Sequence, residues 1–224
     1  SLLRDWRDLC DESKLRFDFS WGAALTTEQL ASIEATVQEQ IRDAIPVQSM
    51  VADLNAAKEI CSLRAVFGEQ YPDPVRVVTV GGDGVQAMID APTKDEWKAY
   101  STEFCGGTHI GNSKEASKFA LLSEEGLGRG VRRVVGVTGE KAAAAFATAA
   151  ALAAEAEKAA ALGGKELEAA VAELVKPLEE GAVMPADAKI ALRNKVNDLK
   201  KKSKGWREFL CTDFLSKSYG LPRS

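Results

Sequence analysis

Apolar and polar side chains alternate in the first clearly patterned segment of the chain, residues 14–20 (KLRFDFS). A period of two places the apolar side chains on one side of an extended backbone and the polar ones on the other, which predicts a half-buried strand. Two segments rich in β-branched residues, 76–80 (RVVTV) and 131–137 (VRRVVGV), also predict strands. Residues 119–122 have the same character.

A helical pattern follows the first strand. Thr26-Thr27-Glu28-Gln29 has the spacing of a capping box, which opens helices. Apolar residues then recur every three to four positions as far as Pro46, so we expect one amphipathic helix here. A short second helix is expected near residues 53–61. Gly81-Gly82-Asp83-Gly84 predicts a turn, and no GK[ST] follows that would make it a phosphate loop.

The character of the sequence changes at Gly139. Of the 20 residues from 142 to 161, 14 are alanine, a strong helix former with little side chain to bury. Two more helices are expected at residues 165–176 and 186–202, with a loop between Pro177 and Pro185. Helices joined by short breaks predict a helical hairpin or a coiled-coil-like arm.

These patterns predict an α+β fold in which a mixed sheet packs with helices, followed by an α-helical hairpin. We place the first domain at residues 1–138 and the helical arm at 139–204, and we make no assignment for residues 205–224. The glycines of residues 126–130 predict a sharply turning loop before the last strand.

Composition narrows the class of protein. The 224 residues carry a formal net charge of −4, with a pI near 5.3, unlike a dedicated non-specific nucleic-acid binder. No apolar run approaches the roughly 20 residues that span a bilayer. The four cysteines form no CxxC pair, so we expect reduced thiols. We therefore expect a cytoplasmic location, with an organelle as the alternative.

The segment most informative about chemistry is TEFCGGTH, residues 102–109. Cys105 and His109 are residue types that bind zinc, and Gly106 and Gly107 allow the backbone to bend and a substrate to approach. By spacing alone, a buried cysteine near an incidental histidine is the more common outcome. His109 is nevertheless the only histidine in the chain. The two residues supply only two of the three or four protein ligands that zinc usually has.

The sequence EFCGGTH resembles the metal-binding signature of the editing domain of alanyl-tRNA synthetases and of their free-standing trans-editing relatives. Residues 15–20 (LRFDFS) resemble a strand of that domain, and residues 63–81 (LRAVFGEQYPDPVRVVTVG) are similar to its eukaryotic form. Residues 130–142 (GVRRVVGVTGEKA) resemble the stretch that closes it. Order and spacing agree over residues 15–139, and more loosely to 204.

This resemblance implies hydrolysis of mischarged seryl- or glycyl-tRNA(Ala). In the full-length family enzyme that reaction accompanies ATP-dependent aminoacylation. The family builds its zinc site from an upstream HxxxH pair together with the residues that correspond to Cys105 and His109. The chain holds no HxxxH, so we expect its sequence to start within the editing domain and to carry half of the zinc site.

The resemblance also suggests roles for individual residues. Thr108 is the candidate catalytic residue, and Gly106 and Gly107 are candidates for contact with the ester. Arg132 and Arg133 are candidates for contact with tRNA phosphates. Adjacent residues of a strand face opposite sides, so we expect at most one of the two arginines on the binding face. A solvated or salt-bridged arginine is the commoner outcome.

Three interpretations stay open at this point. The chain is a fragment of a synthetase whose partners are the acceptor end of tRNA(Ala) and the rest of the enzyme. Alternatively, it is a catalytically inactive homologue that serves as a structural subunit of a larger assembly. The third interpretation, a free-standing deacylase, is the least supported because of the missing histidines.

Overall fold

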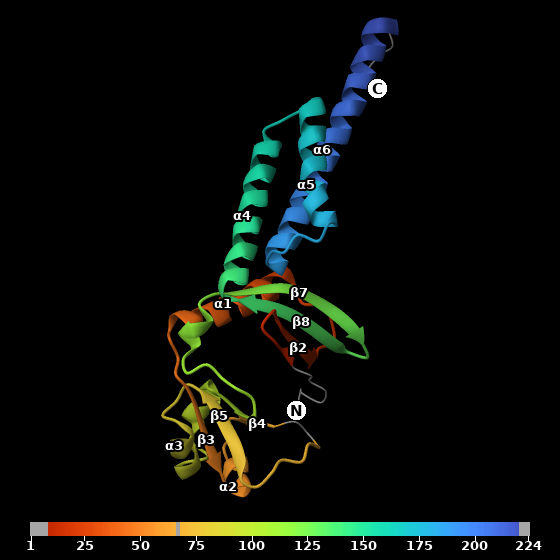
Figure 1. The fold of residues 1–224 in the computed structure, drawn as a ribbon. Helices are drawn as coiled ribbons and strands as arrows, with labels where there is room; N and C mark the ends of the chain where they lie inside the picture. Colours follow the sequence, from red (N-terminus) through yellow and green to blue (C-terminus); the bar gives the residue numbers. More distant parts are fainter. Residues whose placement is uncertain (1–8, 66–67, 220–224) are drawn as a thin grey trace. The chain divides into compact units, whose positions relative to one another are not determined.

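The structure is a computed structural model that describes residues 9–65 and 68–219, with side chains described as far as Lys204. The chain divides between Glu140 and Lys141 into two compact units, which we describe in turn. The expected α+β architecture followed by helices is confirmed (Figure 1).

The first unit contains all the strands, together with three α-helices and two short 3₁₀ helices, among the described residues. In chain order these elements are β1 (Leu9–Cys10), β2 (Leu15–Ser20), α1 (Thr27–Arg42), β3 (Val47–Ala52), α2 (Leu54–Lys58), β4 (Leu63–Arg64), β5 (Val75–Val80), α3 (Val85–Asp90), η1 (Asp95–Ala99), β6 (Ser101–Phe104), η2 (Ser113–Ala116), β7 (Phe119–Gly128) and β8 (Val131–Thr138).

The strands form two four-stranded sheets rather than the single mixed sheet that the sequence suggested. One sheet has the order β1-β2-β8-β7 and is antiparallel throughout. The other has the order β3-β5-β6-β4, in which only β4 and β6 are parallel. The candidate residues of CGGTH follow β6 in the second sheet, whereas Arg132 and Arg133 lie on β8 in the first.

The connection from β7 to β8 is shorter than expected. We predicted a loop over residues 126–130, but β7 continues to Gly128 and only Arg129 and Gly130 lie between the strands. Both residues have positive φ, 52° for Arg129 and 76° for Gly130. Such φ values match the twist of tight hairpin turns, so Gly130 belongs to a two-residue turn, whereas Gly126 and Gly128 lie within β7.

Helix α1 is confirmed together with its capping box, in which Thr26 and Gln29 exchange side-chain and backbone hydrogen bonds. The helix also covers the edge strand β7. The buried Glu34 carboxylate accepts a hydrogen bond from the Leu121 backbone N–H at 2.8 Å, and the Gln38 amide donates to the Phe119 carbonyl. These contacts satisfy backbone groups that an edge strand otherwise leaves exposed.

The core of the second sheet lies on the face that α2 and α3 cover. Val77 of β5 is fully buried within an apolar cluster, and a second cluster surrounds Trp97 of η1. Two buried threonines on neighbouring strands, Thr79 and Thr102, lie within 3.5 Å of each other through their hydroxyl groups. Thr102 is also 2.9 Å from the Ser62 hydroxyl, so buried polar groups help to align the strands.

The second unit consists of helices α4 (Gly139–Ala160), α5 (Gly164–Glu179) and α6 (Ala186–Tyr219), of which α5 and α6 lie side by side (Figure 1). Their shared core is apolar and comprises Ala156, Ala159, Leu167, Val171, Leu174, Met184, Leu192, Val196 and Leu199. Of the unassigned residues 205–224, residues 205–219 continue α6, and residues 220–224 lie outside the described part. No helix among the described residues has the length and hydropathy needed to cross a membrane.

The expected loop after α5 begins later than predicted. Pro177 lies inside α5, which ends at Glu179. A proline in the last turn removes a single helical hydrogen bond, and its own carbonyl accepts from the Ala182 N–H at 2.8 Å. The helix therefore continues through Pro177 before the loop that ends at Pro185.

We predict that Glu34→Ala destabilises the first unit by about 1–3 kcal/mol, because the buried Leu121 N–H loses its acceptor. Urea unfolding followed by circular dichroism measures the change. Glu39→Ala on the same helix is the matched control, since the Glu39 side chain is 64% exposed. An equal effect of the two substitutions would contradict a specific role for Glu34.

Candidate functional site

The CGGTH segment begins where β6 ends. Phe104, the last residue of β6, pairs with Val77 of β5, and the Cys105 N–H donates to the Arg76 carbonyl at 3.2 Å. Directly opposed residues in an antiparallel pair share a face, so Cys105 lies on the face of Arg76. This face is opposite to the one on which Val77 enters the core.

Arg76 connects this segment to the sheet. Its guanidinium donates from Nη1 to the Gly107 carbonyl and from Nη2 to the Ser49 hydroxyl, the second bond measuring 3.1 Å. His109 Nδ1 lies 3.1 Å from the same Gly107 carbonyl. The Gly107 carbonyl is thus contacted by both Arg76 and His109, although Gly107 itself is exposed to solvent.

The middle of the segment is open. Gly106, Gly107, Thr108 and His109 are all exposed, and Cys105 is partly buried. We expected the glycines to let the backbone bend, but neither has positive φ. A Cβ at Gly106 would meet nothing within 4 Å, and one at Gly107 would meet only the Cys105 sulfur at 3.6 Å. The fold itself therefore does not require glycine at these positions.

Cys105 and His109 are the two zinc-ligand types in this segment. Among the residues whose side chains the structure describes, 9–65 and 68–204, no three or more His, Cys, Asp or Glu side chains are arranged to hold a metal ion. Zinc sites in proteins use at least three protein ligands. The donor set of the described residues is thus too small for a complete zinc site.

Arg132 and Arg133 are both engaged in ion pairs and face opposite sides of β8. Arg132 pairs with Glu124 of β7, and the space above Gly126 is filled by its guanidinium, 2.6 Å from where a Cβ would lie. Arg133 binds both oxygens of the buried Asp18 carboxylate at 2.7 Å. Arg132 and Arg133 are adjacent on β8, and adjacent residues of a strand lie on opposite faces. The two candidate sets, these arginines and the CGGTH segment, lie in different sheets.

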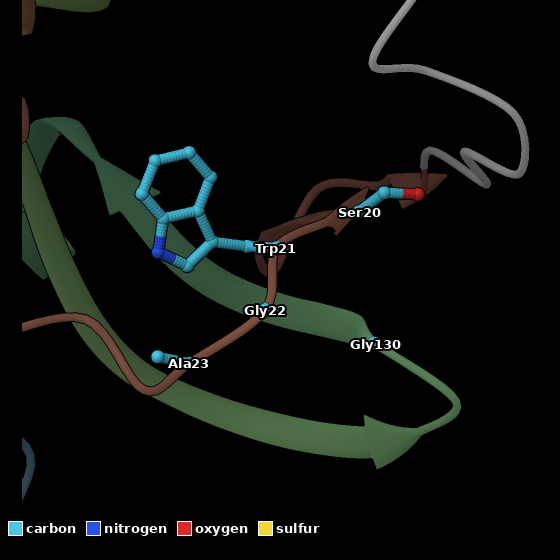
Figure 2. A pocket seen from close by; sticks show the side chains of 5 residues that line it. All are labelled: Ser20, Trp21, Gly22, Ala23 and Gly130. Atoms are coloured by element: carbon cyan, nitrogen blue, oxygen red, sulfur yellow. The ribbon is translucent and has the colours of Figure 1, made fainter.

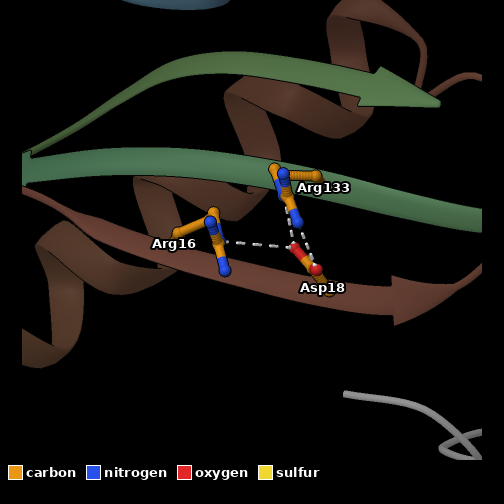
Figure 3. A network of polar contacts seen from close by, with 3 residues as sticks. All are labelled: Arg16, Asp18 and Arg133. Carbon is orange, nitrogen blue, oxygen red and sulfur yellow. Dashed lines mark hydrogen bonds and ion pairs between the residues drawn. The ribbon is translucent and has the colours of Figure 1, made fainter. Parts of the chain in front are cut away.

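Asp18 is the centre of a small polar network that the sequence did not single out. Figure 3 shows the guanidinium groups of Arg16 and Arg133 directed at its carboxylate from two neighbouring strands. The Arg16 Nε lies 4.0 Å from Asp18 Oδ1. Hydrogen bonding to Asp18 raises the pKa of the Arg133 guanidinium, so this arginine is firmly charged and paired.

An open depression of about 540 Å³ lies at the end of β2, and sequence reasoning did not find it. Its lining consists of Ser20, Trp21, Gly22, Ala23 and Gly130. Figure 2 shows the Trp21 indole standing beside the β7–β8 hairpin, and 42% of this residue is exposed. The backbone N–H of Trp21 donates to the Gly130 carbonyl at 2.8 Å, which connects the depression to the hairpin turn. In the sequence, a tryptophan directly after the alternating strand was the one signal that could have indicated this depression.

Part of the first unit matches a known protein family. The family model described as the Threonyl and Alanyl tRNA synthetase second additional domain matches residues 75–135. The match begins at β5 and includes the whole CGGTH segment and both candidate arginines. It ends within β8.

Several curated proteins are similar to the chain. It is 52% identical over 136 residues to the cytoplasmic alanine–tRNA ligase of Dictyostelium discoideum, covering 61% of this chain and 14% of that protein. The mitochondrial alanine–tRNA ligase of Saccharomyces cerevisiae is 46% identical over 129 residues, covering 58% of this chain and 13% of that protein. The cytoplasmic enzyme of Drosophila melanogaster is 36% identical over 195 residues, which cover 84% of this chain and 20% of that protein. The chain thus spans less than a quarter of each relative.

We predict that Asp18→Asn destabilises the first unit by about 2 kcal/mol, because the substitution removes the charge that two arginines share. Thermal and urea unfolding measure the loss. Asp95→Asn removes a carboxylate from an exposed pair with Lys98 and is expected to have no measurable effect. A wild-type stability for Asp18→Asn would show that the network contributes little.

Proposed function

We propose that this chain, which belongs to the alanyl-tRNA synthetase family, supplies the CGGTH part of an editing site that hydrolyses seryl- or glycyl-tRNA(Ala). An aminoacylation pocket for alanine excludes neither the smaller glycine nor serine, which adds one hydroxyl. A second site that hydrolyses the wrong esters solves this problem. The reaction is the cleavage of an ester at the 3′ end of the tRNA.

The observation that carries this proposal is the exposed and anchored CGGTH segment within the region that matches the family model. The backbone of the segment is held to the sheet by Arg76, while Gly106 and Thr108 face solvent. Among the described residues, none beyond the chain neighbours has an atom within 4 Å of the position that a Cβ would take at Gly106. A large substrate such as the end of a tRNA requires this combination of fixed backbone and open approach.

The proposed roles follow from these positions. Thr108 is the catalytic candidate, with its hydroxyl beside the ester. Gly106 and Gly107 allow the aminoacyl end to approach the backbone closely. Cys105 and His109 are proposed as two ligands of a zinc ion whose other ligands are not among the described residues. We assign no step of the hydrolysis to that ion, because the described donors do not complete its site.

The proposed RNA partner is the acceptor end of tRNA(Ala), and the proposed protein partner is the rest of a synthetase or a larger assembly. Arg132 and Arg133 remain candidates for phosphate contact through guanidinium N–H groups not directed at Glu124 and Asp18. Their side chains are 18% and 22% exposed, so such contacts are limited in area.

A cytoplasmic location is proposed because the relatives from Dictyostelium discoideum and Drosophila melanogaster are named as cytoplasmic.

One observation favours a second candidate function. Among the described residues, no third His, Cys, Asp or Glu side chain joins Cys105 and His109, which fits a homologue that keeps the fold without the chemistry. In that case the chain is a structural subunit of a larger assembly. The two functions differ in whether the chain hydrolyses the ester.

We predict that any release of serine from seryl-tRNA(Ala) by the chain supplied with Zn²⁺ depends on the CGGTH segment, so that Gly106→Ala and His109→Ala each lower the rate at least about tenfold. Release of labelled serine measures the reaction. Gly22→Ala is the matched control for Gly106→Ala, because at both glycines a Cβ would meet nothing within 4 Å. A rate no higher than spontaneous hydrolysis would exclude editing by this chain alone and leave a fragment of a synthetase or a structural subunit.

Zinc binding provides an independent prediction. With two described donors, the chain alone is expected to bind Zn²⁺ weakly, and Cys105→Ser or His109→Ala to weaken that binding further. Competition with a chromogenic chelator measures the affinity. Cys61→Ser is the control, since this exposed cysteine lies outside the segment. Tight binding at one ion per chain would reveal ligands beyond Cys105 and His109.

A further inference from the structure

We propose that Arg76 is a positioning residue that holds the CGGTH segment and directs the Nε2 atom of His109 toward the ligand of the site. The inference deepens the proposed function and rests on it for the identity of that ligand. The positioning itself is a property of the free chain. The argument starts from the two acceptors that the Arg76 guanidinium reaches.

Arg76 connects three parts of the second sheet. It lies on β5, its Nη2 donates to Ser49 on β3 at 3.1 Å, and its Nη1 donates to Gly107 beyond the end of β6. Its own carbonyl accepts from the Cys105 N–H at 3.2 Å. Both the first and the third residue of CGGTH are thus bound by the same arginine, one through its backbone and the other through its side chain.

The Gly107 carbonyl transmits this constraint to His109. A carbonyl oxygen only accepts hydrogen bonds, so the hydrogen bond that the 3.1 Å separation allows forms only when His109 Nδ1 carries the proton. The neutral imidazole then has its lone pair on Nε2. Since His109 is exposed, this nitrogen is available to a ligand, whether a metal ion or a polar group of the substrate.

A lysine cannot replace Arg76 in this arrangement. The guanidinium is planar and presents separate N–H groups in a fixed fork, which here reach Ser49 and Gly107 simultaneously. An ammonium group is a point charge on a flexible stem and does not fix two acceptors in one plane. Arg76→Lys therefore keeps the charge and loses the geometry, and this separates positioning from electrostatics.

The test reads the protonation site of His109 directly. His109 is the only histidine of the chain, so selective ¹⁵N labelling of histidine gives one pair of ring-nitrogen signals without assignment by mutagenesis. Spectra are recorded without substrate and with a chelator, at a pH where the imidazole is neutral. The wild type is expected to show a protonated Nδ1 and an unprotonated Nε2. A wild-type ring protonated mainly on Nε2 would overturn the proposal before any variant is made.

The variants test the role of Arg76. Arg76→Lys and Arg76→Gln are expected to shift His109 several-fold toward the Nε2–H form that an unconstrained histidine side chain favours in water, with the backbone amide shifts of β5 retained. Ser49→Ala, which removes one of the two acceptors, is expected to have a smaller effect of the same sign. Arg42→Lys, in an exposed pair with Glu39, is the matched control. Unchanged ring-nitrogen signals in folded Arg76→Lys would overturn the role of Arg76.

This outcome is separable from that of the proposed function. The tautomer is measured in the absence of seryl-tRNA(Ala), so a chain that fails to release serine can still show Arg76-dependent positioning. Conversely, a chain that hydrolyses the ester while Arg76→Lys leaves the His109 signals unchanged would retain the proposed function and lose this inference.

Discussion

The antiparallel pairing of β5 with β6 determines where the candidate site lies. The pairing places Thr79 opposite Thr102 on the buried face, where their hydroxyl groups lie 3.5 Å apart, and it brings the Cys105 N–H to the Arg76 carbonyl on the continuation of the same ladder. Because side chains alternate along a strand, a slip of one residue would send Arg76 into the core and Val77 to the surface. The buried threonines and Val77 therefore fix the register on which the exposed segment depends.

The site combines a rigid base with an open segment. Arg76 holds Gly107 through one hydrogen bond and reaches Ser49 through another, whereas Gly106 has nothing within 4 Å of the position of a Cβ. An arrangement of this kind suits a ligand that arrives from solvent and contacts the backbone. Among the residues whose side chains the structure describes, no third metal donor joins Cys105 and His109, and zinc sites usually have at least three protein ligands. Whether the chain hydrolyses the ester therefore separates the proposed editing function from the proposed structural one.

Arg132 and Arg133 have a different role in the first unit. Arg132 and Arg133 occupy the two faces of β8 and pair with Glu124 and Asp18, so they join strands of the first sheet. The Asp18 carboxylate is nearly buried, and such a group needs charged or hydrogen-bonding partners in the folded state. The Arg132-Arg133 pair therefore stabilises the first sheet. Any contact with RNA would use only the exposed part of these two side chains.

The sequence by itself determined the features that depend on neighbouring residues. Alternation predicted β2, the Thr26–Gln29 capping box predicted the start of α1, and the alanine-rich run predicted α4, because each reflects a local period or a local hydrogen bond. Only the tertiary structure decided the contacts between distant segments. Asp18 and Arg133 are 115 residues apart, Glu34 and Leu121 are 87 apart, and Arg76 and Gly107 are 31 apart. No local pattern encodes which polar group a side chain meets on a distant strand or helix. Such contacts follow from strand order and register, which form only when the whole unit packs.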